Sequence, residues 1–225
     1  MHIGKGYRVL RFILWLFTPK MKTEWEVPFD GEPCVFCPNH ARAWGPIDMC
    51  VHFELRDQSH TWYNAGIIDR KGLPAYVRND NWWNPKSKLA FFYNATIPYI
   101  VSWILPPVIR STPGIPVYYD EHVIKTFKDS VEVLKQGEHL VIFAQYPDGY
   151  QHHASELSKG FLLIAPMAYR RLGIRLKFYP VHVDQKKRTI RVMKPVEYDP
   201  DRKHEEQEAE LLQAIGSRVW DDEQG

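Results

Sequence analysis

The sequence predicts an α/β protein with a mixed, mostly parallel central sheet, helices on both faces of that sheet, and a further helix at the N-terminus. Short apolar segments typical of strands alternate along the chain with amphipathic segments of helical period, which is the pattern of the α/β class. The segment 140–143 is apolar at every position, as expected of a strand in a sheet covered on both faces.

Length and composition limit the domain organisation and the kinds of partner. With 225 residues the chain is long enough for one domain with a large core. We expect residues 1–30 to form an N-terminal helix and link, and residues 31–225 to form a single domain. The net charge of +2 gives no reason to expect a nucleic-acid partner. Aromatic residues make up 14% of the chain, and their clusters suit either a core or a membrane interface.

Residues 7–17 form an apolar segment that carries two arginines. This segment is too short to span a bilayer, and no small-residue cleavage site of a signal peptide follows it. Two interpretations remain open: a helix that lies in a membrane interface, and a helix that docks on the core.

Local patterns predict the remaining elements in chain order. Strands are expected at 34–37, 61–64, 114–118, 140–143, 174–183 and 189–193, and helices at 47–55, 123–136, 158–172 and 205–219. The helix at 123–136 is expected to bury Ile124, Phe127, Val131 and Leu134 and to end at Gly137, and the next is expected to break at Pro166. Residues 20–31 and 72–88 are expected to be a polar link and a loop.

The longest apolar run covers residues 89–109. Its length would permit a membrane span, but Pro98, Pro106 and Pro107 interrupt it and polar residues dilute it. We therefore expect a buried or membrane-dipping helix rather than a span.

The three cysteines, Cys34, Cys37 and Cys50, do not form an even disulfide framework, so a reducing compartment is expected. The spacing of Cys34 and Cys37, with His40 nearby, invites a zinc site. However, residues three apart on a strand point to opposite faces, so no metal is expected there. A weaker alternative is a metal hydrolase that uses His40, Asp48 and the pair His152-His153.

Several segments, in order, resemble the glycerolphosphate and lysophospholipid acyltransferase (PlsC-like) family. Asn39-His40 after an apolar strand is similar to the first motif of that family, and Gly114 to Val117 is similar to its second. The segment 135–143 is similar to the approach to its third motif, and Lys159 to Phe161 followed by 179–181 is similar to its fourth region. The resemblance covers roughly residues 34–198.

The resemblance implies an enzyme that moves a fatty acyl group from acyl-CoA or acyl carrier protein to a hydroxyl of a lysolipid-like acceptor, with no other cofactor. It implies that His40 is the general base and that Asp48 orients it. The residues implied to contact substrate are Asn39, Arg42, Tyr119, Asp148, Gly149 and His152. Membrane lipids are the implied partners, and the cytoplasmic face of a membrane is the implied location.

The sequence also departs from the family pattern. The family has an Asp five positions after the His, where this chain has Gly45, so Asp48 is the candidate for that role. The third motif is replaced by Ala144-Gln145, with a shifted match that includes Asp148 and Gly149, and Tyr119 stands near the usual Arg of the second motif. Because the arginine is missing, the acceptor is expected to differ from lysophosphatidic acid. The alternative is a catalytically degenerate, lipid-binding relative.

Overall fold

The computed structural model describes residues 4–41, 44–79, 90–118, 120–144 and 159–220. At the centre of its sheet, five parallel strands lie in the spatial order β6 (Lys177–Asp184), β2 (Cys34–Pro38), β5 (His139–Val141), β3 (Ser59–Asn64) and β4 (Ile115–Val117). Strands β7 (Thr189–Val192) and β8 (Val196–Glu197) pair with β6 in antiparallel orientation, and β1 (Lys22–Trp25) runs parallel to β7. The predicted mixed, mostly parallel sheet is therefore confirmed.

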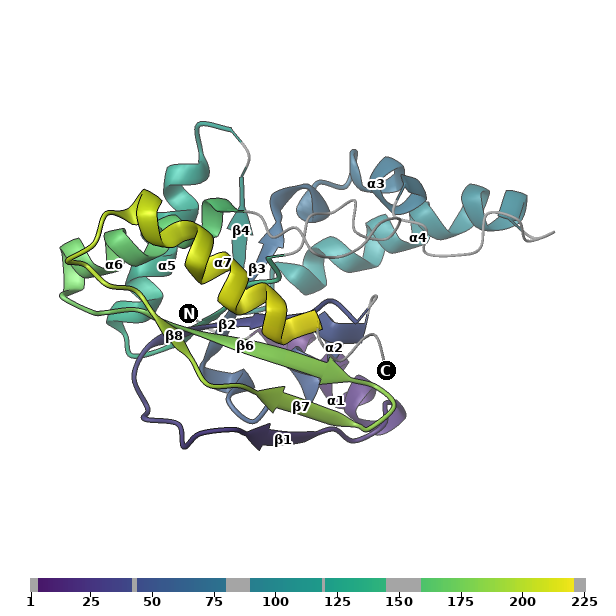
Figure 1. The fold of residues 1–225 in the computed structure, drawn as a ribbon. Helices are drawn as coiled ribbons and strands as arrows, with labels where there is room; N and C mark the ends of the chain where they lie inside the picture. Colours follow the sequence, from purple (N-terminus) through teal and green to yellow (C-terminus); the bar gives the residue numbers. More distant parts are fainter. Residues whose placement is uncertain (1–3, 42–43, 80–89, 119, 145–158, 221–225) are drawn as a thin grey trace.

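Helices cover both faces of the sheet, as expected (Figure 1). One face packs against α5 (Val123–Lys135), α6 (Ile164–Leu172) with the short helix η4 (Lys159–Leu163), and α7 (His204–Trp220). The other face packs against Met49 of α2 (Trp44–Val51), Phe53 and the half-buried Trp25. Two further short helices, η1 (Arg56–Gln58) and η2 (Ala65–Ile68), flank β3.

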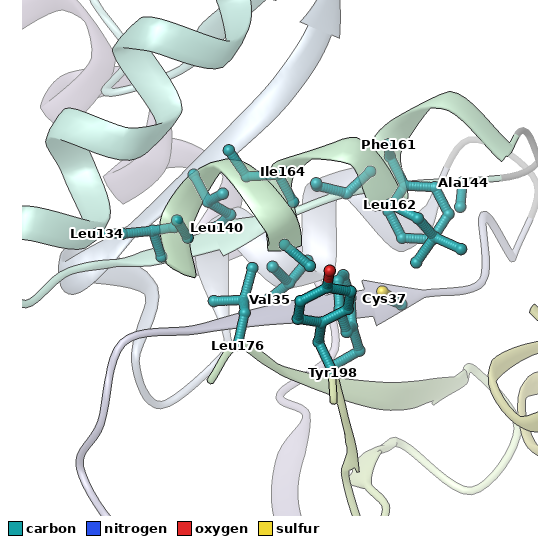
Figure 2. Packing of buried hydrophobic residues seen from close by; sticks show 14 of the residues in the cluster. Val35, Cys37, Leu134, Leu140, Ala144, Phe161, Leu162, Ile164, Leu176 and Tyr198 are labelled. Carbon is teal, nitrogen blue, oxygen red and sulfur yellow. The ribbon is translucent and has the colours of Figure 1, made fainter. Parts of the chain in front are cut away.

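Strand β2 is buried along its whole length because it lies between β6 and β5 and is covered on both faces. Val35 and Cys37 belong to one core cluster, which Figure 2 shows packing around Leu140 and Leu176. Cys34 and Phe36 belong to the cluster on the opposite face. The two cysteines therefore point to opposite faces, as the alternation along a strand predicts.

The structure differs from the sequence prediction at two polar segments. The predicted link contains β1, an edge strand whose side chains are exposed or half-buried, so its sequence has no apolar run to mark it. The predicted loop at 72–88 contains the helix α3 (Leu73–Asn79). Leu73 and Val77 lie one helical turn apart and are both fully buried, and Pro74 near the start of the helix needs no helical N–H donor.

Two other details of the helices were predicted imperfectly. Ile124 is exposed on α5, whereas Phe127, Val131 and Leu134 are buried as expected. Pro166 lies in the first turn of α6 and does not break that helix, because the first helical N–H groups have no partner within the helix. Gly137 has φ +80° directly after α5 ends, which is the left-handed conformation that glycine favours at such a position.

The N-terminal helix α1 (Lys5–Phe17) and the helix α4 (Ala90–Ile109) touch where one begins and the other ends. The backbone N–H of Gly4 donates to the carbonyl oxygen of Ser111 over 2.9 Å. Helix α4 continues through Pro98, which deprives the carbonyl of Asn94 of its helical donor, and Nε of Arg78 donates to that carbonyl instead. Within the described ranges, no helix meets the length and hydropathy needed to cross a membrane.

Candidate active site

The candidate site lies at the carboxyl edge of the parallel strands. His40 follows β2, Phe143 follows β5, and Gln185 follows β6. The rings of His40 and Phe143 are in contact, with centroids 4.7 Å apart. Because parallel strands end at the same edge of a sheet, this is the edge at which α/β proteins place their ligands.

Asn39 fixes the end of β2 against β6. Its side chain is buried, its Oδ1 accepts a hydrogen bond from the N–H of Val183 over 2.7 Å, and its Nδ2 donates to the carbonyl of Val183 over 3.4 Å. The backbone N–H of Asn39 donates to the carbonyl of Val181. The sequence predicted Asn39 as a substrate contact. In the structure its side-chain amide extends the hydrogen bonding between β2 and β6. It therefore fixes the position of the backbone from which His40 follows.

A tight turn joins His40 to helix α2. The N–H of Gly45 donates to the carbonyl of His40 over 2.8 Å. A Cβ atom at position 45 would lie 2.5 Å from the carbonyl oxygens of both Asn39 and His40, so only glycine fits there. Ala41, within the turn, has φ +41°, a conformation that costs a non-glycine residue free energy.

Asp48 is buried one helical turn after Gly45, with 2% of its surface exposed. Residues three apart lie on the same face of a helix, so the side chain of Asp48 projects from the face of α2 that lies against the end of β2. Its carboxylate accepts a hydrogen bond from the side-chain amide of Gln185. Helix α2 therefore connects the turn at His40 to the end of β6.

The electrostatics of His40 and Asp48 are dominated by burial. Burial lowers the pKa of His40 to about 4, so the imidazole is neutral at neutral pH. Burial raises the pKa of Asp48 to about 6, and the hydrogen bond from Gln185 opposes part of that rise. A charged His–Asp pair would shift both pKa values in the opposite directions. The direct pairing of His40 with Asp48 therefore stays a prediction, and the partner of Asp48 in the structure is Gln185.

Sequence reasoning missed Gln185. The available signal was its position, since it directly follows the apolar strand that pairs with β2, as Asn39 directly follows β2 itself. The other predicted contacts, Arg42, Tyr119, Asp148, Gly149 and His152, lie outside the described residues, as does His153.

The described residues contain no group of three or more His, Cys, Asp or Glu side chains that could hold a metal ion. Cys34 and Cys37 are kept apart by the strand, and burial raises the pKa of both thiols. At the opposite edge of the sheet, Sγ of Cys34 lies 3.6 Å from Nδ1 of His139, and the buried His60 contacts Glu138. These two pairs stabilise the amino-terminal ends of β2, β3 and β5.

Comparisons with known proteins identify no relative. No family model, curated protein or solved structure matches this chain.

Proposed function

We propose that the protein is an acyltransferase that moves a fatty acyl group from a thioester donor, acyl-CoA or acyl carrier protein, to a hydroxyl of a lysolipid-like acceptor. The observation that carries the proposal is the position of His40 two residues after the central strand β2, at the carboxyl edge of the sheet. The ordered resemblance of residues 34–198 to PlsC-like acyltransferases supplies the reaction.

In this proposal a ring nitrogen of His40 removes the proton from the acceptor hydroxyl. The acceptor oxygen attacks the thioester carbonyl, a C–O bond forms, and the C–S bond breaks as the thiolate leaves. The imidazolium then returns the proton to the thiolate. General-base help of this kind contributes about 10²–10⁴-fold to the rate. The neutral state of His40 supports the role, because a base must begin unprotonated.

Asp48 is proposed as a positioning residue. Its carboxylate is held by Gln185 on the face of α2 that Gly45 brings against the backbone of His40. From there a carboxylate can select the tautomer of the imidazole and stabilise the imidazolium that forms during transfer. A lipid acceptor and a cytosolic thioester donor together favour a peripheral enzyme on the cytoplasmic face of a membrane.

The second candidate is a lipid-binding relative that has lost catalysis. The pKa of about 4 favours it, because a general base works best when its pKa lies near the working pH. The altered third motif at Ala144-Gln145 favours it as well.

The test is an acyl-transfer assay with the full chain, acyl-CoA and acyl carrier protein as donors, and a panel of lysolipid acceptors. We expect transfer to at least one acceptor and poor use of lysophosphatidic acid. His40→Ala should reduce transfer at least ~10²-fold, whereas the exposed His122→Ala should leave it unchanged. Absence of transfer for every combination would favour the lipid-binding candidate.

A further inference from the structure

Helices α1 and α4 expose an unusual amount of apolar surface. Among the described residues, twelve of the sixteen exposed large hydrophobic side chains belong to them, six to each helix. The most exposed are Phe17 on α1, with 83% of its surface accessible, and Phe91 and Trp103 on α4, with 86% and 75%. We call the exposed apolar side chains of α1 and α4, Phe12, Trp15, Phe17, Phe91, Phe92 and Trp103 among them, the α1–α4 surface. Large apolar side chains exposed in such numbers on two touching helices mark an interaction site.

Most charges on and around the α1–α4 surface are basic, and Arg11 of α1 is paired with Asp57. Helix α1 contains Lys5, Arg8 and Arg11 but no acidic residue, and α4 contains no charged residue. Within the described residues, four basic side chains lie over aromatic rings, and all four rings belong to α1 or α4. These contacts are Arg11 over Tyr7, Lys20 over Trp15, Arg70 over Trp103 and Arg78 over Tyr99, at 5.7, 3.1, 5.8 and 5.2 Å from the ring centroids.

The combination of exposed apolar and basic side chains distinguishes between two possible partners, a second copy of the chain and a membrane. A second copy docking symmetrically on the same surface would bring two sets of basic side chains, Lys5, Arg8 and Arg70 of each copy, close together, and like charges oppose such an interface. An anionic bilayer removes that conflict. Its headgroups attract Lys and Arg, its interface accommodates Trp and Tyr rings, and its acyl chains accept the phenylalanines.

We infer that the α1–α4 surface docks on membranes that contain anionic phospholipids. The two helices meet at the hydrogen bond between Gly4 and Ser111, and Figure 1 shows α4 projecting beyond the sheet. Helix α1 also contacts α2, since the Tyr7 hydroxyl donates to the carbonyl of Cys50, and directly after the two helices Thr18 Oγ1 lies 2.8 Å from His52 Nε2. The docking surface therefore adjoins the helix that carries Asp48. The inference goes beyond acyl transfer and does not rest on it, because lipid binding is measured without turnover.

The experiment is co-sedimentation of the full chain with vesicles of phosphatidylcholine alone and of phosphatidylcholine mixed with phosphatidylglycerol. We expect binding to the mixed vesicles to be at least ~10-fold tighter and to weaken at high salt. Phe17→Ser with Phe91→Ser should weaken binding by ~10-fold or more, since both side chains leave the apolar phase. Ile124→Ser on α5 is the control, because Ile124 is an exposed apolar side chain on another helix.

A second experiment tests the role of the basic residues. It compares the double variant Lys5→Gln, Arg8→Gln, which changes two exposed residues of α1, with the double variant Lys128→Gln, Lys135→Gln on α5. Only the first pair should lower binding to anionic vesicles, by at least ~10-fold. Circular dichroism and thermal unfolding should show that every variant folds. Equal binding to both vesicle types, or no binding to either, would overturn the inference. So would a dimer in light scattering that the Phe17→Ser, Phe91→Ser variant dissociates, because the surface would then be a protein interface.

Discussion

The side-chain amide of Gln185 donates a hydrogen bond to the buried carboxylate of Asp48 and so links the end of β6 to helix α2. Two residues earlier on the same strand, the backbone of Val183 bonds the amide of Asn39. His40 therefore follows a strand end that the amide of Asn39 bonds to β6, and Asp48 on the helix that follows has its own donor in Gln185.

Gln185→Leu should raise the pKa of Asp48 above its value of about 6. The hydrogen bond from Gln185 lowers that pKa, whereas burial raises it. Without the hydrogen bond, only the effect of burial remains. If ionised Asp48 supports transfer, the acidic limb of the pH profile of kcat/KM should move to higher pH. Gln136→Leu, an exposed glutamine after α5, is the control and should leave the profile unchanged. An unaltered profile in Gln185→Leu would show that the bond does not tune Asp48.

Asp48→Asn should stabilise the fold most at alkaline pH. The folded pKa of about 6 lies above the ordinary 3.8, so the native state binds more protons between these values. The stability linked to Asp48 is therefore present below pH 3.8 and lost as pH rises through about 6. Asparagine removes this dependence and can still accept from Gln185. Denaturant unfolding at pH 5 and pH 8 would measure it, with the exposed Asp129→Asn as control. A larger gain at pH 5 than at pH 8 would contradict the assignment.

Acid should destabilise the protein through His40 and His139. Burial lowers the pKa of both to about 4, whereas the ordinary value is 6.5. The unfolded state therefore binds more protons between pH 4 and 6.5, and stability falls as pH falls through that window. His40→Asn should reduce the loss, and the exposed His122→Asn should not. Thermal unfolding across pH 4 to 7 tests this, and an identical slope for His40→Asn and wild type would count against it.

Gly45→Ala should cost about 1–3 kcal/mol of stability, because the new Cβ would overlap two backbone carbonyl oxygens that cannot move independently. The shift would also displace His40, so transfer should fall together with stability. Gly160→Ala is the matched control, since a Cβ there would meet nothing within 4 Å. Equal denaturation midpoints for the two variants would show that the turn relaxes without cost.

Part of this site could be predicted from sequence for a clear physical reason. The short apolar segment around Val35 is flanked by turn residues, so a buried strand, its alternating faces and a histidine at its end all followed. Gly45 was interpreted as a departure from a family pattern and, with Pro46, as a bend, but its close contact with the backbone of His40 was not predicted. Its role depends on how closely the backbone of α2 approaches His40, and no local pattern records that distance.

The position of Gln185 directly after a strand marks it only as a candidate, because its partner, Asp48, lies 137 residues away in the sequence. The edge strand β1 was missed for a related reason, since half-exposed strands carry charged residues and show no apolar run. Both features depend on contacts between residues far apart in the sequence, which local sequence patterns do not show.

His40 and Asp48 are expected to act as one unit in transfer. Asp48 lies on the face of α2 that Gly45 brings against the backbone of His40, and its carboxylate can stabilise the imidazolium formed during turnover. His40→Ala should then lower kcat/KM by about 10²–10⁴-fold, and Asp48→Asn by at least ~10-fold, since an orienting carboxylate controls its histidine. The double variant should be no more than ~2-fold worse than His40→Ala alone, because residues that act together are not additive. If the loss in the double variant instead equals the product of the two single losses, Asp48 acts separately from His40, through its hydrogen bond to Gln185 and the stability of α2. Near wild-type activity in Asp48→Asn would show that Asp48 does not assist His40 in transfer.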